Sequence, residues 1–304
     1  MAKHNMGIKV EDENPHGKAV HQLRAKIGEL NNNSKRLMEE GQLFYDKEGF
    51  KGILRRHRIK TPETYMYVSD PEDAHKAISR IKELKLSEFV IKPNNQSQGR
   101  NITVYSRKGN HFVTPSGDVW YYEDIEYNIK HILNTTPAMN KGVILEERIH
   151  THPDLNKWNP IKEGIVDMRL YVIYHMVDFA KMRVPSKGSK GLANTGQGAI
   201  AFHVSEDGMI LNSNYMVNTV TKHPDTNQNL EGEAVPFWDK MTLMAVQISK
   251  LFHLKFHSVD LTVGLDGECI CGESERIPWL GSLSTAGCNH IMTLFKKYSG
   301  EVLD

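Results

Sequence analysis

The segment FHSVDLTVGLDGECICGESE, residues 256–275, decides how the rest of the chain is interpreted. Asp-Gly at 266–267 is a strong signal for a two-residue β-turn, so the apolar runs on either side predict a hairpin of two antiparallel strands. Counting back from that turn places Asp260 opposite Glu273. Glu275 points to the same face as Glu273, because side chains two residues apart share one face of a strand.

Three carboxylates on one face of a hairpin repel each other, and the repulsion grows where the dielectric is low. One interpretation is that the face is solvated or is neutralised by nearby lysines and arginines. The other is that a divalent cation lies between the acids. Val259 and Leu261 alternate with polar neighbours and indicate that the opposite face is buried. Carboxylate oxygens without His or Cys suit Mg²⁺ or Mn²⁺, and Mg²⁺ held in this way usually keeps positions open for substrate phosphates.

The composition fits a globular protein and excludes several classes. The chain has 304 residues, a net charge of +1 and 39% hydrophobic residues, so no global charge draws it to nucleic acid or membrane. No apolar stretch approaches the roughly 20 residues of a membrane span, and the mixed-charge start is not a secretory signal. The three cysteines are too few for a disulfide framework, and Cys269-x-Cys271 has no second ligand pair for zinc. We therefore expect reduced thiols and a cytoplasmic location.

The pattern of apolar residues predicts an α+β protein with mainly antiparallel hairpins rather than βαβ alternation. No G-x-G-x-x-G or Walker A motif is present, which argues against Rossmann and P-loop nucleotide sites. The expected helices cover residues 17–41, 46–57, 69–84, 123–134, 237–252 and 288–298. The expected strands cover residues 64–68, 89–91, 142–148, two runs within 166–184, 199–204, 256–264 and 268–275, with a further apolar run opening at Ile102.

A phosphate site also needs positive charge, and several cations are candidates. The stretch EFVIKPNNQSQGRNITV, residues 88–104, puts Lys92 at the end of a strand and directly before a polar loop. A lone lysine at a strand end is more often a surface residue whose stem packs on the protein. Arg169 and Arg183 lie within apolar runs, where an arginine is usually paired. Asp167 could simply pair with Arg183 across a hairpin. Backbone N–H groups of the loops at 94–101 and 188–198 could cradle phosphates.

Taken in order, these segments resemble motifs of the ATP-grasp superfamily. The likeness is closest to alpha-L-glutamate-ligase-like and sugar-transfer-associated members, which are relatives of the ribosomal-protein glutamate ligases, and it runs from about Asp46 to Pro278. The segments that carry it are FVIKPNNQSQG, VILEER, VDMRLYVI, AKMRVPSKGSKGLANTGQGA, NTVTKHPDT, HSVDLTV and GESERIP.

The resemblance implies an α+β ATP-grasp fold, in which two α+β subdomains clasp ATP. Residues 1–45 would form a reduced helical N-terminal segment in place of a Rossmann-like domain. Residues 46–145 would form the subdomain with the phosphate flap, and residues 146–304 the subdomain with the metal-binding hairpin.

The resemblance also implies roles for individual residues. Nucleotide-binding roles fall to phosphate contacts Lys47 and Lys92, to an adenine hinge of Glu146, Glu147, Arg148 and Ile149, and to a ribose partner, Asp154. The transferring phosphoryl group would face Arg183 and Asn194, and Arg169 would bind the substrate carboxylate or acyl phosphate. The Mg²⁺ (or Mn²⁺) ligands would be Asp260, Glu273 and Glu275.

The chain departs from the family pattern in its last metal motif. That motif is usually Glu-x-Asn followed by Arg-Pro-Gly, whereas here Glu273-Ser274-Glu275 is followed by Arg276-Ile277-Pro278. Glutamate can still bind Mg²⁺, but Arg276 is shifted by one position. The flap has one glycine, where relatives often have several.

The implied activity is that of an ATP-dependent, ADP-forming carboxylate–amine ligase that makes an amide bond through an acyl phosphate. Its substrates would be a small-molecule or peptide carboxylate and an amine acceptor, such as glutamate or another amino acid joined to a peptide or glycan precursor. No nucleic acid or membrane span is expected, and the sequence allows a homo-oligomer. The alternative is an ATP-grasp-type kinase of a polyol or sugar hydroxyl, whose basic pocket would come from LRRHRIK (54–60) or PSKGSKG (185–191). A third possibility is nucleotide binding without catalysis.

Overall fold

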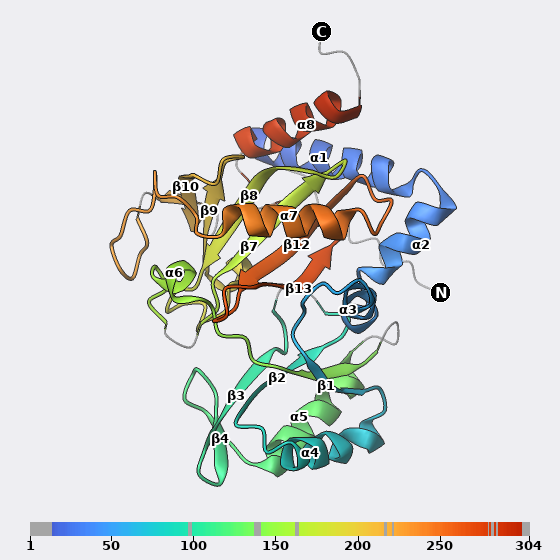
Figure 1. The fold of residues 1–304 in the computed structure, drawn as a ribbon, viewed down its shortest axis with the longest axis vertical. Coiled ribbons are helices and arrows are strands. Elements are labelled where there is room, and N and C mark those ends of the chain that lie inside the picture. Colours follow the sequence, from blue (N-terminus) through green and yellow to red (C-terminus); the bar gives the residue numbers. More distant parts are fainter. Residues whose placement is uncertain are drawn as a thin grey trace.

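The computed structural model describes residues 14–96, 99–136, 141–161, 164–215, 218–220, 222–278, 280, 283 and 285–299. It contains helices and two antiparallel sheets, which confirms the predicted α+β class (Figure 1). The helices are α1 (Pro15–Asn32), α2 (Lys35–Leu43), α3 (Lys47–Arg56), α4 (Ala74–Glu83), α5 (Tyr122–Thr135), α6 (Pro153–Asn156), α7 (Trp238–Ser249) and α8 (Thr285–Ser299), with short 3-10 helices η1 (Pro71–Asp73) and η2 (Thr195–Gln197). The strands are β1 (Thr64–Val68), β2 (Glu88–Pro93), β3 (Thr103–Lys108), β4 (His111–Val113), β5 (Val119–Trp120), β6 (Val143–Glu146), β7 (Asp167–Ile173), β8 (Met176–Val184), β9 (Ile200–Val204), β10 (Ile210–Tyr215), β11 (Asn218–Val220), β12 (Phe256–Val263) and β13 (Cys269–Glu275).

The six-stranded sheet has the order β1-β6-β2-β3-β4-β5 and carries α4 and α5 on one face (Figure 1). Alternation along β2 sorts its side chains between the two faces. Phe89 and Ile91 pack into the core beneath α4 and α5, whereas Val90 and Lys92 point to the opposite face and line a cavity. The sheet thus places Lys92, a predicted phosphate contact, at the cavity wall.

The seven-stranded sheet has the order β11-β10-β9-β8-β7-β12-β13. Met168 and Leu170 of β7 pack against the core under α7, on the face where α7 lies in Figure 1. Asp167, Arg169 and Tyr171 therefore point to the other face, where α1 and α8 cover the ring of Tyr171. Charged side chains occupy the rest of that face, and they form the second wall of the cavity.

Helix α3 joins the two sheets. Its N-cap is Asp46, whose side chain accepts from the Gly49 N–H at 2.9 Å. Phe50 and Leu54 on one side of the helix enter the core of the seven-stranded sheet. Lys51, on another side, reaches the six-stranded sheet. The predicted domain boundaries at residues 45 and 145 stay predictions.

The C-terminal hairpin has the predicted facing pair but not the predicted turn. Val263 pairs with Cys269, so the loop between the strands is longer than the expected two residues. A β-bulge at Gly272 then adds one residue to β13 and brings Asp260 opposite Glu273. The bulge therefore restores the register that gathers the acids.

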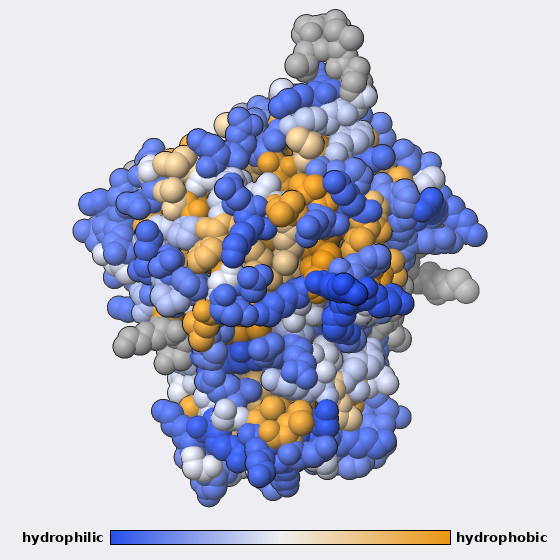
Figure 2. Space-filling view, viewed as in Figure 1, coloured by the Kyte–Doolittle hydropathy of each residue, from blue (hydrophilic) through white to orange (hydrophobic). Residues whose placement is uncertain are grey.

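Apolar side chains also reach the surface. Figure 2 shows them gathered over α7, where Leu243 is 60% exposed. No helix in the described ranges combines the length and the apolar character that a membrane span requires.

Candidate active site

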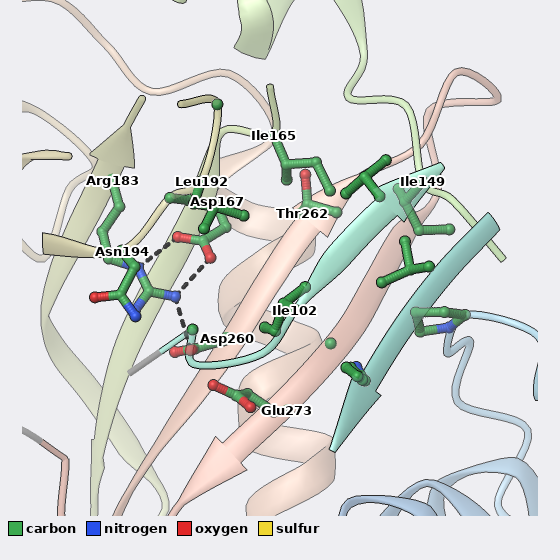
Figure 3. Close-up of a pocket in the computed structure, with 18 of the residues that line it drawn as sticks. Ile102, Ile149, Ile165, Asp167, Arg183, Leu192, Asn194, Asp260, Thr262 and Glu273 are labelled. Atoms are coloured by element: carbon green, nitrogen blue, oxygen red, sulfur yellow. Dashed lines mark hydrogen bonds and ion pairs between the residues drawn. The ribbon is translucent and has the colours of Figure 1, made fainter. Parts of the chain in front are cut away.

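A cavity of about 580 Å³ lies between the two sheets. Its first wall comes from β2, β6 and the residues after β6, and its second from β7, β8, β12 and β13. A loop at residues 190–196 closes one side, and Figure 3 shows Leu192 and Asn194 of this loop beside the charged residues. The two sheets thus contribute residues to one space.

One end of the cavity is apolar. Val90, Ile102 and Ile149 lie on the side of the six-stranded sheet, and Ile165 and Ile270 face them from the other side. Figure 3 shows the side chains of Ile102, Ile149 and Ile165 directed into this space. A slot between branched aliphatic side chains fits a flat, weakly polar ring such as a nucleobase.

The opposite end gathers the three predicted metal acids. One ligand oxygen from each of Asp260, Glu273 and Glu275 lies within 4.8 Å of the others. Asp260 is buried, and the side chains of Glu273 and Glu275 are 32% and 24% exposed on the cavity side. The facing register of β12 and β13 produces this cluster.

Two arginines already contact the acids. Arg169 donates from Nε and Nη2 to the two oxygens of Asp260 at 2.8 and 2.7 Å, and from Nη2 to Glu275 at 2.9 Å. Arg183 donates to Asp260 at 2.7 Å and, through two hydrogen bonds, to Asp167 (Figure 3). Burial alone would raise the pKa of Asp260, but the two arginines lower it to about 2. Asp260 is therefore ionised. The pairing of Asp167 with Arg183, which the sequence left open, is present as well.

The acids nevertheless fit a divalent cation. Carboxylates outnumber cations in this group, which consists of Asp167, Asp260, Glu273 and Glu275 against Arg169, Arg183 and Lys47. Burial, with repulsion from Glu273 and Asp260, raises the pKa of Glu275 although Arg169 opposes the shift. A cation between these oxygens would relieve the repulsion, and an all-oxygen donor set matches Mg²⁺ or Mn²⁺.

Lys92 faces the acids from the other sheet. Its Nζ lies 2.6 Å from Glu146, which also accepts from Lys51 at 2.7 Å. The Glu146 carboxylate, expected in the adenine hinge, thus lies between two lysines. Burial alone would lower the pKa of Lys92, but Glu146 raises it above its ordinary value, so the ammonium stays charged.

The segment around Lys47 is tied to the start of the predicted flap. The Lys47 Nζ donates to the Gln96 carbonyl and lies 3.5 Å from Glu273. Asn94 caps the same region, because its side chain accepts from the Glu48 N–H and donates to Asp46, both at 2.9 Å. Ser97 and Gln98 of the predicted flap, and Thr221 of the NTVTKHPDT segment, lie outside the described residues.

Beyond them, Gly99 closes onto the loop of the other wall. Its φ is +67°, and a Cβ there would lie 3.1 Å from the Asn194 amide nitrogen. Asn194 also caps η2 by accepting from the Gly196 N–H at 2.9 Å. A side chain at position 99 would be strained by its backbone and would press on Asn194.

All four predicted hinge residues line the cavity, whereas two other predicted nucleotide contacts do not. Glu147, Arg148 and Ile149 line the cavity. Arg148 also donates to Glu88 and to Ser106, each at 2.6 Å, which fixes it to β2 and β3. Among the described residues, neither Lys47 nor Asp154 lines the cavity, and the Asp154 side chain is 69% exposed on α6.

Arg276, whose role the sequence left in doubt, also lies outside the described cavity lining. Its guanidinium is buried beneath Gly41 of α2 and donates to the Asn31 carbonyl at 3.2 Å. Asn31 in turn bonds the backbone of Phe256 at the start of β12. Arg276 therefore fastens the N-terminal helices to the hairpin of β12 and β13.

Sequence reasoning missed two buried lysines. Lys51 has no exposed surface and contacts Glu146, although its position four residues after Lys47 on a short helix gave a weak signal. Lys181 lies beside Arg169 in the strand register and is also buried. It extends a polar row that crosses the sheet from Glu273 through Asp260 and Arg169.

Comparisons with known proteins identify the family and the fold. A family model described as sugar-transfer associated ATP-grasp matches residues 29–271. The structure of D-cycloserine synthetase DcsG superposes with a TM-score of 0.51 and 14% identity, covering 92% of this chain and 80% of that one. D-alanyl-alanine synthetase A from Vibrio cholerae O1 biovar eltor str. N16961 gives a TM-score of 0.50 and 10% identity, covering 85% of this chain and 65% of that one. No curated protein matches the chain.

Proposed function

The chain belongs to the sugar-transfer-associated ATP-grasp family and has the ATP-grasp fold, and on this basis we propose that it is an ATP- and Mg²⁺-dependent ligase that joins a carboxylate to an amine. One observation carries the proposal. A single cavity has an apolar slot at one end and, at the other, Lys92 on one sheet facing three clustered carboxylates on the other.

This arrangement supports a binding mode for the nucleotide. The adenine would lie in the apolar slot beside Ile149 and the strand end at Glu147, with its phosphates directed towards Lys92 and Arg183. Asp260, Glu273 and Glu275 are the residues that would hold Mg²⁺. When bound, the cation would neutralise phosphate oxygens during phosphoryl transfer. Lys47 and Asp154 would join the site only through contacts outside the described cavity lining.

The proposed chemistry needs no side-chain nucleophile, and the described lining of the cavity contains no Ser, Cys or His. A substrate carboxylate oxygen attacks the γ-phosphorus of ATP, the bond to the β-phosphate oxygen breaks, and an acyl phosphate and ADP form. An amine then attacks the acyl carbon, phosphate leaves, and the amine loses a proton. The protein's contribution is positioning and fixed positive charge.

Arg169 has a narrower part in this scheme than the sequence suggested. Its Nε and Nη2 are held by Asp260 and Glu275. The proposal therefore gives its remaining terminal nitrogen, Nη1, to the substrate carboxylate. Arg183, which shares Asp260, and Asn194 would face the transferring phosphoryl group.

The kinase alternative draws less support from the geometry. A phosphorylated acceptor requires a basic pocket, and the LRRHRIK segment was one candidate for it. Instead, Arg55 pairs with Glu48 and Lys60 pairs with Asp266. None of residues 54–60 is among the described cavity-lining residues. From the other candidate loop, PSKGSKG, the described lining includes Lys190 and Gly191.

A substrate screen tests the proposal. ADP release is measured with Mg²⁺–ATP across amino acids, peptides and sugar acids, each with and without an amine partner, and products are identified by mass spectrometry. We expect ADP only when a carboxylate and an amine are both present, and a product whose mass equals their sum less one water. A product that gains one phosphate would favour the kinase instead.

A further inference from the structure

Lys51 of α3 is a fully buried lysine that belongs to no recognised part of the site. Its Nζ donates to Glu146 at 2.7 Å and to the Thr64 hydroxyl at 3.1 Å, and lies 3.4 Å from Glu48. A buried charge persists only where partners compensate it. Glu48 is shared, because it also binds Arg55. Glu146 is therefore the principal partner of Lys51.

Glu146 is bonded by two lysines, one at each carboxylate oxygen. Lys51 reaches it from α3, and Lys92, in the neighbouring strand β2, lies 2.6 Å from it. Lys92 and Glu146 line the cavity, whereas Lys51 does not appear in its described lining. The carboxylate is consequently held from behind by one lysine and faces the cavity beside the other.

The charges of this cluster decide how strongly Lys92 can attract phosphate. If Glu146 had Lys92 as its sole partner, the pair would be neutral, and an incoming phosphate would compete with a buried carboxylate for the same ammonium. Lys51 supplies a second cation, so the three groups keep one net positive charge at the cavity wall. In a buried site that residual charge is weakly screened.

We propose that Lys51 is a positioning residue for nucleotide binding, because it takes over the charge of Glu146 and leaves the Lys92 ammonium available to the ATP phosphates. This inference rests on the proposed ATP-binding function of the cavity. On nucleotide binding, Lys92 turns from Glu146 to a phosphate oxygen, while Lys51 keeps the carboxylate paired. Lys51 touches no substrate in this scheme.

Charge-matched variants test the idea with Mg²⁺–ADP and with adenosine as probes, by isothermal titration calorimetry. Lys51→Met leaves Lys92 neutralised by Glu146, so we expect ADP binding to weaken about tenfold or more. Adenosine binding should change less than about threefold, because adenosine has no phosphate. Lys76→Met on α4, which removes an exposed charge paired with Asp73, serves as the control and should leave both affinities unchanged.

The double variant Lys51→Met/Glu146→Gln separates a charge role from a structural one. It restores one net positive charge at Lys92, so ADP affinity should return to within about threefold of wild type. If Lys51 acts only by packing α3 against β6, the double variant will bind ADP as weakly as Lys51→Met or more weakly, which would overturn the inference. Equal losses for ADP and adenosine would also overturn it.

Two further results keep the test decisive. Should Lys51→Met fail to fold, Glu146→Gln alone still tests the charge argument, because removing the competing carboxylate should tighten ADP binding. Weaker ADP binding by Glu146→Gln would contradict the inference. A wild-type protein that binds no ADP at all would instead refute the proposed function, so the two failures are distinguishable.

Discussion

Replacing Asp260 by asparagine should separate the structural role of the proposed metal ligands from their catalytic role. Asp260 is 4% exposed and accepts hydrogen bonds from Arg169 and Arg183. Breaking a buried ion pair by removing one partner costs about 3–5 kcal/mol. Each arginine keeps a second carboxylate, Glu275 or Asp167, and asparagine retains one oxygen. We therefore expect the low end, about 3 kcal/mol.

Glu273→Gln is the matched comparison. The side chain of Glu273 is 32% exposed, and its ion pair with Lys47 spans 3.5 Å. A partly exposed pair at this longer distance contributes about 0–1 kcal/mol. Both variants should lose Mg²⁺-dependent ATP turnover, but only Asp260→Asn should lose substantial stability.

Thermal unfolding followed by circular dichroism, without nucleotide, measures the difference. At about 2–4 °C per kcal/mol, Asp260→Asn should lower the Tm by about 6–12 °C, and Glu273→Gln should lower it by less than about 4 °C. A Tm of Asp260→Asn within about 2 °C of wild type would contradict this expectation, because it would show that the Asp260 carboxylate is not needed to stabilise the two buried arginines.

Three further predictions concern stability. Burial lowers the pKa of His257 from 6.5 to about 3, so only the unfolded state binds a proton there as the pH falls from about 7.5 to about 5.5. The free energy of unfolding should therefore fall by about 1.4 kcal/mol over this range. Guanidinium unfolding should show a smaller pH effect in His257→Phe, and an unchanged effect would contradict the assignment. The hydroxyl of Tyr171 is buried and has no hydrogen-bond partner among the described residues. Tyr171→Phe should therefore stabilise the protein by about 1 kcal/mol, and a lower Tm would count against this. A Cβ at Gly41 would lie 2.6 Å from Arg276 Cδ, so Gly41→Ala should cost about 1–3 kcal/mol in denaturant unfolding, and wild-type stability would show that the buried arginine moves freely.

The sequence was sufficient for the elements with strong local signals. The α+β class, which the local hydrophobic periodicity indicated, and the ATP-grasp fold, which the resemblance of the motifs implied, are both confirmed. Asp70, for example, directly precedes Pro71 and caps η1 by accepting from the Glu72 N–H.

The facing of Asp260 and Glu273 was predicted correctly for an incomplete reason. The hairpin loop is longer than the Asp-Gly signal implied, and the bulge at Gly272 compensates for the difference. Turn propensity describes a few residues, whereas the register of a whole hairpin also depends on how both strands pack against their neighbours.

The partners of buried charges could not be read from the sequence. Arg169 was predicted to bind the substrate carboxylate or the acyl phosphate, yet it also donates to two of the proposed metal ligands, which lie 91 and 106 residues away along the chain. Lys51 received no role, because its partner Glu146 lies 95 residues later, on strand β6. Such contacts depend on how the two sheets meet, and no local pattern encodes that arrangement.

The proposed mechanism requires that a substrate carboxylate becomes an acyl phosphate in the cavity between the sheets. Hydroxylamine trapping tests it directly, because an acyl phosphate reacts with hydroxylamine to give a stable hydroxamate and phosphate. With Mg²⁺–ATP, an active carboxylate and hydroxylamine in place of the amine partner, wild type should form ADP and hydroxamate in equal amounts. Glu273→Gln should form neither. ADP formation with a phosphorylated hydroxyl product and no hydroxamate would contradict the claim.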